Sequence, residues 1–312
     1  MPRHKTGMGR NDGDKMSSRV QLMKQKGLIS PPKWLPPNIH YEVITGSVSY
    51  AVSSDTSDMD VVGFCMPPKD DIFPHLRGEI PGFGLQHKRF EVWQEHHIID
   101  KEARQEYDFS IYSIVKFFQL AMENNPNMVD ILFTPQRCVL YCSAVAQIVR
   151  DNRKLFLTKN SYHKFRGYAY AQLHKIGTKS NSSNPKRQAD IENHGMDLKF
   201  AYHVIRLALE GEQILMEHDL NIERNAEVLK AVRRGDWSEE KLRGWFDEKE
   251  KHLEELYAKS TLRHVPDEEA IKDLLMQCLE QHYGSLDSAV KREVPVERMI
   301  SELKAVLERY EQ

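Results

Sequence analysis

The sequence is most constrained by two aspartates that stand directly before an apolar pair. In the stretch GSVSYAVSSDTSDMDVVG, Asp58 and Asp60 are one residue apart, and Val61 and Val62 follow. Residues two apart on a β-strand point to the same face, so both carboxylates share one face while Val61 points to the other. Burying an unpaired charge costs roughly several kcal/mol. A strand with this pattern therefore requires a partner that neutralises the pair.

A bound Mg²⁺ ion is the partner that this pattern favours, because phosphate-bound Mg²⁺ is typically held by one or two carboxylates and by oxygens of the substrate. The rival interpretation is a calcium-binding EF-hand, in which Asp58, Asp60 and Gly63 occupy loop positions one, three and six. Position twelve is then Lys69, where an EF-hand needs a bidentate Glu. The sequence thus predicts a phosphate site rather than a calcium loop.

Gly46 and Ser47 supply a second element of the predicted site. They follow residues 39–45, a stretch rich in β-formers that predicts a strand leading into a turn and a short helix. A Gly-Ser pair at a strand-to-helix turn leaves backbone N–H groups and one hydroxyl facing an anion. We therefore expect Gly46 and Ser47 to bind nucleotide phosphates.

Asp108 is the candidate for a third carboxylate. In the stretch YDFSIY, the opposite-parity residues Tyr107, Phe109 and Ile111 are expected to face a core, which leaves Asp108 on the other face. Asp100 is the alternative, and helix capping is the competing interpretation for either aspartate.

Three carboxylates on neighbouring strands, Asp58, Asp60 and Asp108, predict a site that is both catalytic and metal-binding. Two Mg²⁺ or Mn²⁺ ions about 3.5–4 Å apart order a triphosphate and lower the pKa of an attacking hydroxyl. The reaction expected of such a site is in-line transfer of a nucleotidyl group from an NTP, such as ATP, with pyrophosphate leaving.

The predicted organisation is a basic arm, an α/β domain and a helical domain. Residues 1–37 carry many Lys and Arg with little periodicity, and we expect a partly disordered arm with one helix that ends near Gly27. Residues 38–140 contain the predicted strands, and residues 141–312 are helical in pattern almost throughout. The fold class is therefore α+β, a mixed sheet followed by an all-helical domain. The predicted strands span residues 39–45, 58–64, 90–99 and 107–112, with a helix from Ile114.

Ordered sequence blocks between about Leu28 and about Gly284 resemble the RlaP-like predicted nucleotidyltransferases of the DNA polymerase beta superfamily, a family associated with RNA repair genes. The blocks are TGSVSYAVSSDTSDMDVVGF, YSIVKFFQLAMENNPNMVDILFTP, FRGYAYAQL, NPKRQADIENHGMDLKFAYHVIRLALEGEQIL and LKAVRRGDWSEEKL. The order Gly-Ser, Asp-x-Asp and a third carboxylate is that of the polymerase-beta-type fold. One departure is Ala51, where the family usually has Gly. The resemblance implies a polymerase-beta-type nucleotidyltransferase domain over residues 38–140.

The resemblance also implies nucleotide-binding residues on a later helix. Lys199, His203 and Arg206, together with Asp197, match the family's DxKxxxH..R pattern. A cationic stripe beside a metal site suits triphosphate binding and the charge of the leaving group. Without the resemblance, the same stripe is typical of a solvated helix face, on which Arg206 and Glu210 form an ordinary i,i+4 pair.

The acceptor of the nucleotidyl group is the least constrained part of the prediction. An RNA or tRNA end is expected, held by cations near the site at Lys175, Lys179, Lys186 and Arg187, since a net charge of -2 does not suit a long duplex track. The alternatives are nucleotidylation of a protein hydroxyl and a catalytically idle nucleotide-binding module.

Other features of the sequence exclude several classes of protein. His96 and His97 are not expected to share a metal, because adjacent strand residues face opposite sides. The four cysteines include no CxxC pair and are expected to be reduced thiols. No apolar run approaches the about 20 residues that span a bilayer, and the start lacks the apolar core of a secretory signal. We therefore expect a cytoplasmic protein without a membrane partner.

Overall fold

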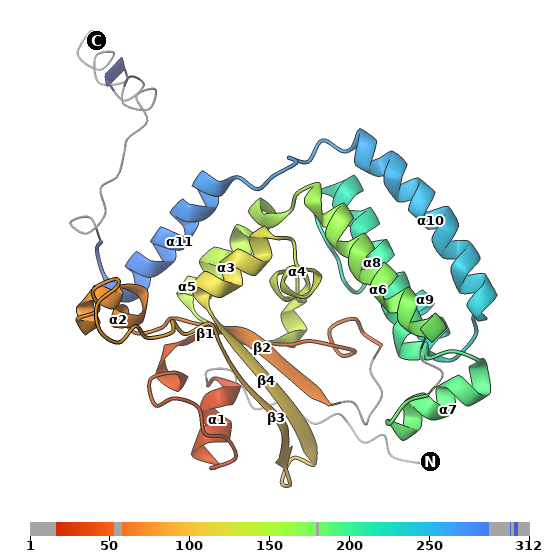
Figure 1. Cartoon of the computed structure of the whole chain (residues 1–312), viewed down its shortest axis with the longest axis horizontal. Coiled ribbons are helices and arrows are strands. Elements are labelled where there is room, and N and C mark those ends of the chain that lie inside the picture. Colours follow the sequence, from red (N-terminus) through yellow and green to blue (C-terminus); the bar gives the residue numbers. More distant parts are fainter. Residues whose placement is uncertain (1–16, 53–57, 179–180, 287–299, 301–302, 305–312) are drawn as a thin grey trace, which may run out of the picture.

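A computed structural model of the chain describes residues 17–52, 58–178, 181–286, 300 and 303–304 (Figure 1). The described strands form one sheet in the order β3-β4-β2-β1-β5. They are β1 (Ile39–Ile44), β2 (Met59–Cys65), β3 (Val92–Asp100), β4 (Gln105–Ser113) and β5 (Val139–Cys142). The α-helices are α1 (Arg19–Gln25), α2 (Lys69–Ile72), α3 (Ile114–Met122), α4 (Pro126–Leu132), α5 (Ala144–Asp151), α6 (Asn160–Thr178), α7 (Pro185–His194), α8 (Leu198–Glu217), α9 (Ala226–Arg233), α10 (Glu239–Lys259) and α11 (Glu268–Tyr283). Short 3₁₀ helices cover Pro36–Asn38, Pro74–Arg77, Gln136–Cys138 and Arg153–Phe156.

The sheet is mixed, and the predicted α+β class is confirmed. Strands β2 and β4 run parallel, whereas β1 pairs antiparallel with β2 and β5, and β3 pairs antiparallel with β4. Parallel neighbours require a crossover connection, and here the chain passes through the edge strand β3 between β2 and β4. The four predicted strands lie within two residues of their expected bounds, while α2, α4, β5 and α7 were not predicted.

Apolar side chains cover both faces of the sheet. On one face, Tyr41 and Phe64 pack in a large cluster with α3, α4, α5, α6, α8 and α11. On the opposite face, Val61 and Phe109 pack with Val20 of α1 in a smaller cluster. Figure 1 shows α1 on the other side of the sheet from α3 and α5. The strand alternation that separates Val61 from Phe64 therefore decides which side chains face the helices.

Residues 18–37 are packed, which corrects the expectation of a partly disordered arm up to residue 37. Ser18 caps α1, and the side chain of Val20 is fully buried. The buried carboxylate of Glu42 in β1 accepts hydrogen bonds from the Ser18 hydroxyl at 2.8 Å and from the Val20 backbone N–H at 3.1 Å. A helix N-terminus stabilises a carboxylate placed in this way. The rest of the predicted arm, residues 1–16, lies outside the described residues.

The predicted boundary between residues 140 and 141 falls inside β5. The cluster that contains Tyr41 of β1 also contains Ile271 of α11, so the sheet and the helices after it share one apolar core. The change of periodicity in the sequence marks where the helices begin, not where the sheet ends. The last part of the predicted helical region, residues 287–312, lies outside the described residues except at 300 and 303–304. In the part of the chain that the structure describes, no helix has the length and apolar character to cross a membrane.

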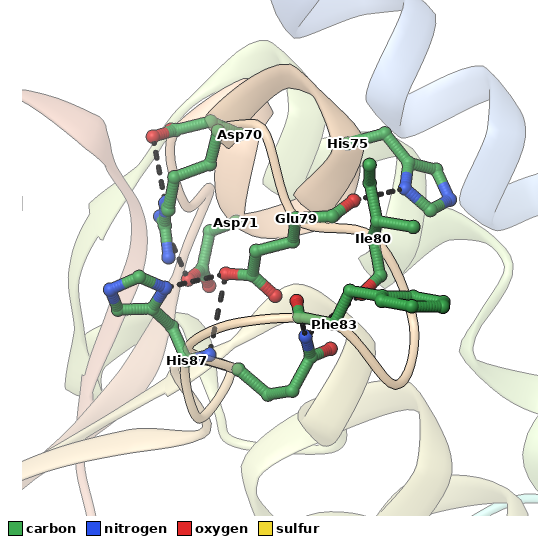
Figure 2. Close-up of polar contacts among 9 residues, drawn as sticks. Asp70, Asp71, His75, Glu79, Ile80, Phe83 and His87 are labelled. Carbon is green, nitrogen blue, oxygen red and sulfur yellow. Dashed lines mark hydrogen bonds and ion pairs between the residues drawn. The ribbon is translucent and has the colours of Figure 1, made fainter.

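The connection between β2 and β3 is held by its own polar contacts (Figure 2). The Nδ1 atom of His87 lies 2.7 Å from Oε1 of Glu79, and the amide of Gln86 donates to the carbonyl oxygens of Ile80 and Phe83 at 3.0 Å. These contacts fix the loop while the side chains of Ile80 and Phe83 stay 61% and 74% exposed. The loop follows the C-terminal end of β2 and so lies away from the aspartates at the N-terminal end of that strand.

Candidate active site

Asp60 and Asp108 lie side by side on adjacent strands. They are register partners on the parallel strands β2 and β4, and register partners carry their side chains on the same face. Asp60 has the parity of Phe64, so this is the face that the helices cover. Asp58 directly precedes β2 with the same parity as Asp60, and it is exposed. Tyr107, on the opposite face of β4, is buried in the smaller cluster, as predicted.

Asp60 is half-buried among charges of its own sign. Burial raises the pKa of its carboxyl, and the carboxylates of Asp108 and Asp58 raise it further. Lys199 from α8 and His96 from β3 act in the opposite direction. The cations of the protein therefore do not fully compensate the acidic side chains at this edge of the sheet.

The turn that follows β1 lies against Asp60. Gly46 has φ +71°, and a Cβ atom added to it would lie 2.7 Å from Oδ2 of Asp60, so only glycine fits without a shift. The Thr45 backbone N–H donates to the carbonyl oxygen of Asp60 at 2.8 Å, and the Ser49 N–H donates to that of Gly46 at 3.2 Å. Residues 46–51 form successive turns, not the short helix that was predicted. The carbonyl oxygen of Ser47 accepts a 3.0 Å hydrogen bond from the backbone N–H of Val52.

Ala51 ends this turn in the left-handed region, with φ 57°. This conformation favours glycine, which accounts for the glycine that the resembled family usually has at the position. The Ala51 N–H donates to the carbonyl oxygen of Val48 at 3.1 Å. The alanine therefore adopts a glycine-like turn conformation at a cost in backbone strain.

The donor chemistry of Asp60 and Asp108 fits a divalent cation. Carboxylate oxygens are the ligands that Mg²⁺ and Mn²⁺ prefer, and a cation would relieve the repulsion that raises the pKa of Asp60. Within the described ranges, however, no group of three His, Cys, Asp or Glu side chains already converges as a metal site. The expected ligand set of Asp58, Asp60 and Asp108 thus supplies the correct atoms without a preformed cage.

Lys199 and His203 lie on the first turns of α8. Lys199 is exposed, and its backbone N–H donates to the N-cap carboxylate of Asp197 at 2.9 Å. Burial, together with the charges of Arg206 and Lys199, lowers the pKa of His203 to about 3. His203 is therefore a neutral imidazole in a cationic environment. Such an environment suits an anionic ligand.

Arg206 does not belong to this exposed stripe. It is 5% exposed, and its Nη1 atom contacts the hydroxyl of Tyr50 at 2.8 Å and a carboxylate oxygen of Glu210 at 2.9 Å. It also forms an ion pair with Asp130 of α4. The expectation that Arg206 binds nucleotide directly is therefore wrong, because the core, and not the site, surrounds its guanidinium. The i,i+4 pair with Glu210 is present, but it is buried rather than solvated.

His96 and His97 were missed as neighbours of the site. A β-bulge between Glu95 and Ile98 interrupts the alternation of β3, and His97 has φ 58°. The backbone N–H of His97 donates to Oδ1 of Asp108 at 2.7 Å, and Nδ1 of His96 lies 3.6 Å from the same oxygen. The prediction that the two histidines face opposite sides assumed a regular strand. No feature of the local sequence indicates the bulge.

Asp100, the alternative third carboxylate, is a structural residue. It is buried, pairs with Lys26 at 2.7 Å and accepts backbone hydrogen bonds from Glu102 and Ala103. The Lys26 hydrogen bond holds the pKa of the Asp100 carboxyl below its ordinary value. Asp108 is thus the β4 carboxylate that faces Asp60.

Only some of the cations that were expected to bind the acceptor lie close together. Arg187 of α7 pairs with Asp197 at 2.6 Å and lies over the Phe200 ring, and Lys175 of α6 lies over the same ring. Lys186 is exposed on α7, and Lys179 lies outside the described residues. Arg187 and Lys175 therefore meet at the start of α8, near Lys199.

Comparisons with known proteins find the following similarities. The profile of RlaP, described as the RNA repair pathway DNA polymerase beta family, matches residues 21–277. An uncharacterized 38.9 kDa protein from the nrdC-mobD intergenic region of Enterobacteria phage T4 is 30% identical over 136 residues. That alignment covers 43% of this chain and 37% of the phage protein, so the match spans well under half of that relative. A nucleotidyltransferase-like protein from Exiguobacterium sibiricum 255-15 shares 9% identity at a TM-score of 0.28, over 86% of this chain and 83% of its own.

Proposed function

The chain belongs to the RlaP family, and we propose that it is a metal-dependent nucleotidyltransferase that transfers NMP from an NTP to a hydroxyl group. The observation that carries the proposal is the register of Asp60 with Asp108 beside the Gly46 turn. A purely structural turn does not require two carboxylates that repel each other beside a position that only glycine can occupy without a shift. The divalent metal ions that accompany a triphosphate bring the opposite charge.

Different residues of the site bind the phosphates and accept the proton of the acceptor. Gly46 and Ser47 bind phosphate oxygens through the turn, and Lys199 and the neutral His203 line the cationic side. Asp108 accepts the proton of the acceptor hydroxyl. The oxygen of that hydroxyl then forms a bond to the α-phosphorus, the bond from this phosphorus to the bridging oxygen breaks, and pyrophosphate leaves with the electron pair.

Asp58, Asp60 and Asp108 are the residues that would hold Mg²⁺ or Mn²⁺. When bound, the metal neutralises triphosphate charge and acidifies the attacking hydroxyl. Asp58 is exposed at the rim, whereas Asp60 and Asp108 are fixed by their strands.

We propose an RNA end as the acceptor. Lys175, Arg187 and Lys199 gather near the start of α8, which suits a short contact with a nucleic-acid backbone rather than a long duplex track. The family is described as an RNA repair pathway family, which also favours RNA as the acceptor. Binding should weaken with salt by about 0.7 in log K per phosphate for each tenfold change, with roughly two to four phosphates engaged.

The test is to incubate the protein with labelled NTPs, Mg²⁺ or Mn²⁺, and separate pools of RNA, DNA and protein. We expect label on RNA with the wild-type protein and none with Asp60→Asn. Label on protein that RNA does not compete away would replace the RNA acceptor by a protein hydroxyl. Turnover that is equal in the wild type and in Asp60→Asn would reject the active site itself.

A further inference from the structure

A buried polar cluster lies directly beneath the Gly46 turn. It consists of Tyr50 from the turn, Asp130 from α4, and Arg206 and Glu210 from α8. All four are 5% exposed or less. The cluster therefore joins the turn to two helices that are distant from it in sequence.

Arg206 is the centre of this cluster. Its Nη1 atom donates to the Tyr50 hydroxyl at 2.8 Å and to Oε1 and Oε2 of Glu210 at 3.1 and 2.9 Å, and it also contacts Asp130. The hydroxyl of Tyr50 in turn donates to Asp130, and the guanidinium lies 4.7 Å from the centre of the Tyr50 ring. Tyr50 is thus held at both its ring and its hydroxyl.

The cluster is not a favourable way to fill a core. Oδ1 of Asp130 and Nε of Arg206 are buried and have no hydrogen-bond partner within the part of the chain that the structure describes. An unsatisfied buried polar atom costs free energy, and apolar residues of similar volume are often at least as stable as a buried ion pair. Stability alone therefore does not explain why this cluster lies beneath the turn.

The position of Tyr50 supplies this reason. Tyr50 follows Gly46 by four residues, and Gly46 lies against the Asp60 carboxylate. The same helix that presents Arg206 to Tyr50 carries Lys199 seven residues earlier, or about 10 Å along the axis at 1.5 Å per residue. The cluster therefore fixes the turn relative to the cationic start of α8.

We propose that Tyr50, Asp130 and Arg206 are positioning residues that hold the phosphate-binding turn at a set distance from Lys199. This inference rests on the proposed nucleotidyl transfer, and it assigns Arg206 a role without contact to the nucleotide. Small misplacements of binding groups lower the rate steeply, by about a hundredfold for 1 Å. Tyr50→Phe removes only the hydroxyl of Tyr50 and therefore disturbs the packing of the cluster least.

The test compares Tyr50→Phe with Tyr41→Phe. Tyr41 is a matched control, because its buried hydroxyl also contacts an arginine, Arg150, and donates to the carbonyl oxygen of Ile131 at 3.1 Å, away from the turn. We expect Tyr50→Phe to lower kcat/KM for the NTP about tenfold, and Tyr41→Phe to leave it within about twofold. Equal values in the two variants would overturn the proposal.

Hydrogen exchange tests the positioning role of Tyr50 independently of nucleotidyl transfer. Backbone N–H groups of Ser49, Ala51 and Val52 make the hydrogen bonds of the turn, and their exchange needs no substrate. We expect Tyr50→Phe to raise exchange in residues 46–52 about tenfold over Tyr41→Phe, with β1 and β2 unchanged. Unchanged exchange in that segment rejects the positioning role, even if the wild-type protein transfers no nucleotide.

Two further variants address coupling and folding. If Tyr50 acts by setting the distance to Lys199, Tyr50→Phe should have a smaller effect on kcat/KM in a Lys199→Ala background than in the wild type, whereas fully additive effects would contradict the proposal. Asp130→Asn keeps the shape of the side chain and should reproduce the exchange pattern of Tyr50→Phe. If Asp130→Asn does not fold, Tyr50→Phe decides the question alone.

Discussion

In the open group, Asp58 is exposed and Asp60 and Asp108 are half-buried, whereas in the enclosed group Asp130 and Glu210 lie in the core around Arg206. Both groups contain more carboxyls than nearby cations. The enclosed group satisfies its charge with a guanidinium, a tyrosine hydroxyl and burial that raises the pKa of its carboxyls. In the open group, Lys199 and His96 offset the raised pKa of Asp60 only in part, and we propose that a ligand from outside completes the site. We propose that this difference separates a structural use of acidic residues from a functional one.

The largest effect that tests this difference is loss of activity in the open group. Asp60→Asn and Asp108→Asn should each lower metal-dependent transfer by about 10³-fold or more, because each removes a charge that the metal and the acceptor proton require. Removing an uncompensated charge should leave the thermal midpoint unchanged or slightly raised. Turnover with labelled NTP and thermal melting measure the two quantities. A large fall in the midpoint with retained turnover would place these aspartates in the structural class.

The next effect concerns the enclosed group. Arg206→Met should lower the free energy of unfolding by about 3–5 kcal/mol, because the carboxyls of Asp130 and Glu210 stay buried and lose the guanidinium that donates to them. Arg224→Met is the matched control on the same part of the chain, since Arg224 pairs with Glu217 at the surface and its removal should change stability little. Urea unfolding compares the two. A similar small loss in both variants would mean that the enclosed group is not an integral ionic cluster.

A smaller effect on activity is expected from Lys199, which lies near the open group. Lys199→Ala should raise KM for the NTP by about tenfold, because an exposed cation close to a phosphate contributes about 1 kcal/mol or slightly more. Metal binding, followed by calorimetry with Mn²⁺, should stay the same. Glu192→Ala, on the exposed surface of α7, is a control that should change neither quantity. Unchanged nucleotide kinetics in Lys199→Ala would leave the cationic stripe as a solvated face.

The smallest effect is a change in pH dependence. Burial raises the pKa of Glu210 well above its ordinary value. A carboxyl with a raised folded pKa contributes stability that is present below about pH 4.5 and is lost as pH rises through the folded pKa. Glu210→Gln should therefore flatten the decline of the unfolding free energy as pH rises above about 4.5, and should change that free energy by no more than about 1 kcal/mol at neutral pH. A steeper decline in the variant would show that Glu210 is charged in the native protein.

The open group was predictable from the sequence because strand alternation shows which face each of its residues takes. Asp58 and Asp60 show their shared face by spacing alone, and Asp108 is separated from Tyr107 and Phe109 by simple alternation. The register of β2 with β4 then brings Asp108 to Asp60. Strands with clear alternation carry this information directly.

The enclosed group was not predictable, since its members meet only in the folded chain. Arg206 and Glu210 have the spacing of a surface pair, and nothing near them in sequence indicates that Tyr50 and Asp130 cover them. Strand β5 has four half-buried residues, too few for a period to be recognised. Helix α7 buries no residue, so it has no apolar stripe to predict it.

Tyr50 and Arg206 lie 156 residues apart in the chain. At roughly 5–20 residues per second, a ribosome makes Tyr50 about 8 to 30 s before it makes Arg206. The strands that carry the three aspartates are therefore synthesised well before the residue that fixes the turn beside them. If Arg206 positions the turn as we propose, the candidate site becomes ordered late in synthesis. A nascent chain that stops before α8 then has every predicted carboxylate but lacks the arginine that holds the turn of residues 46–51 in place.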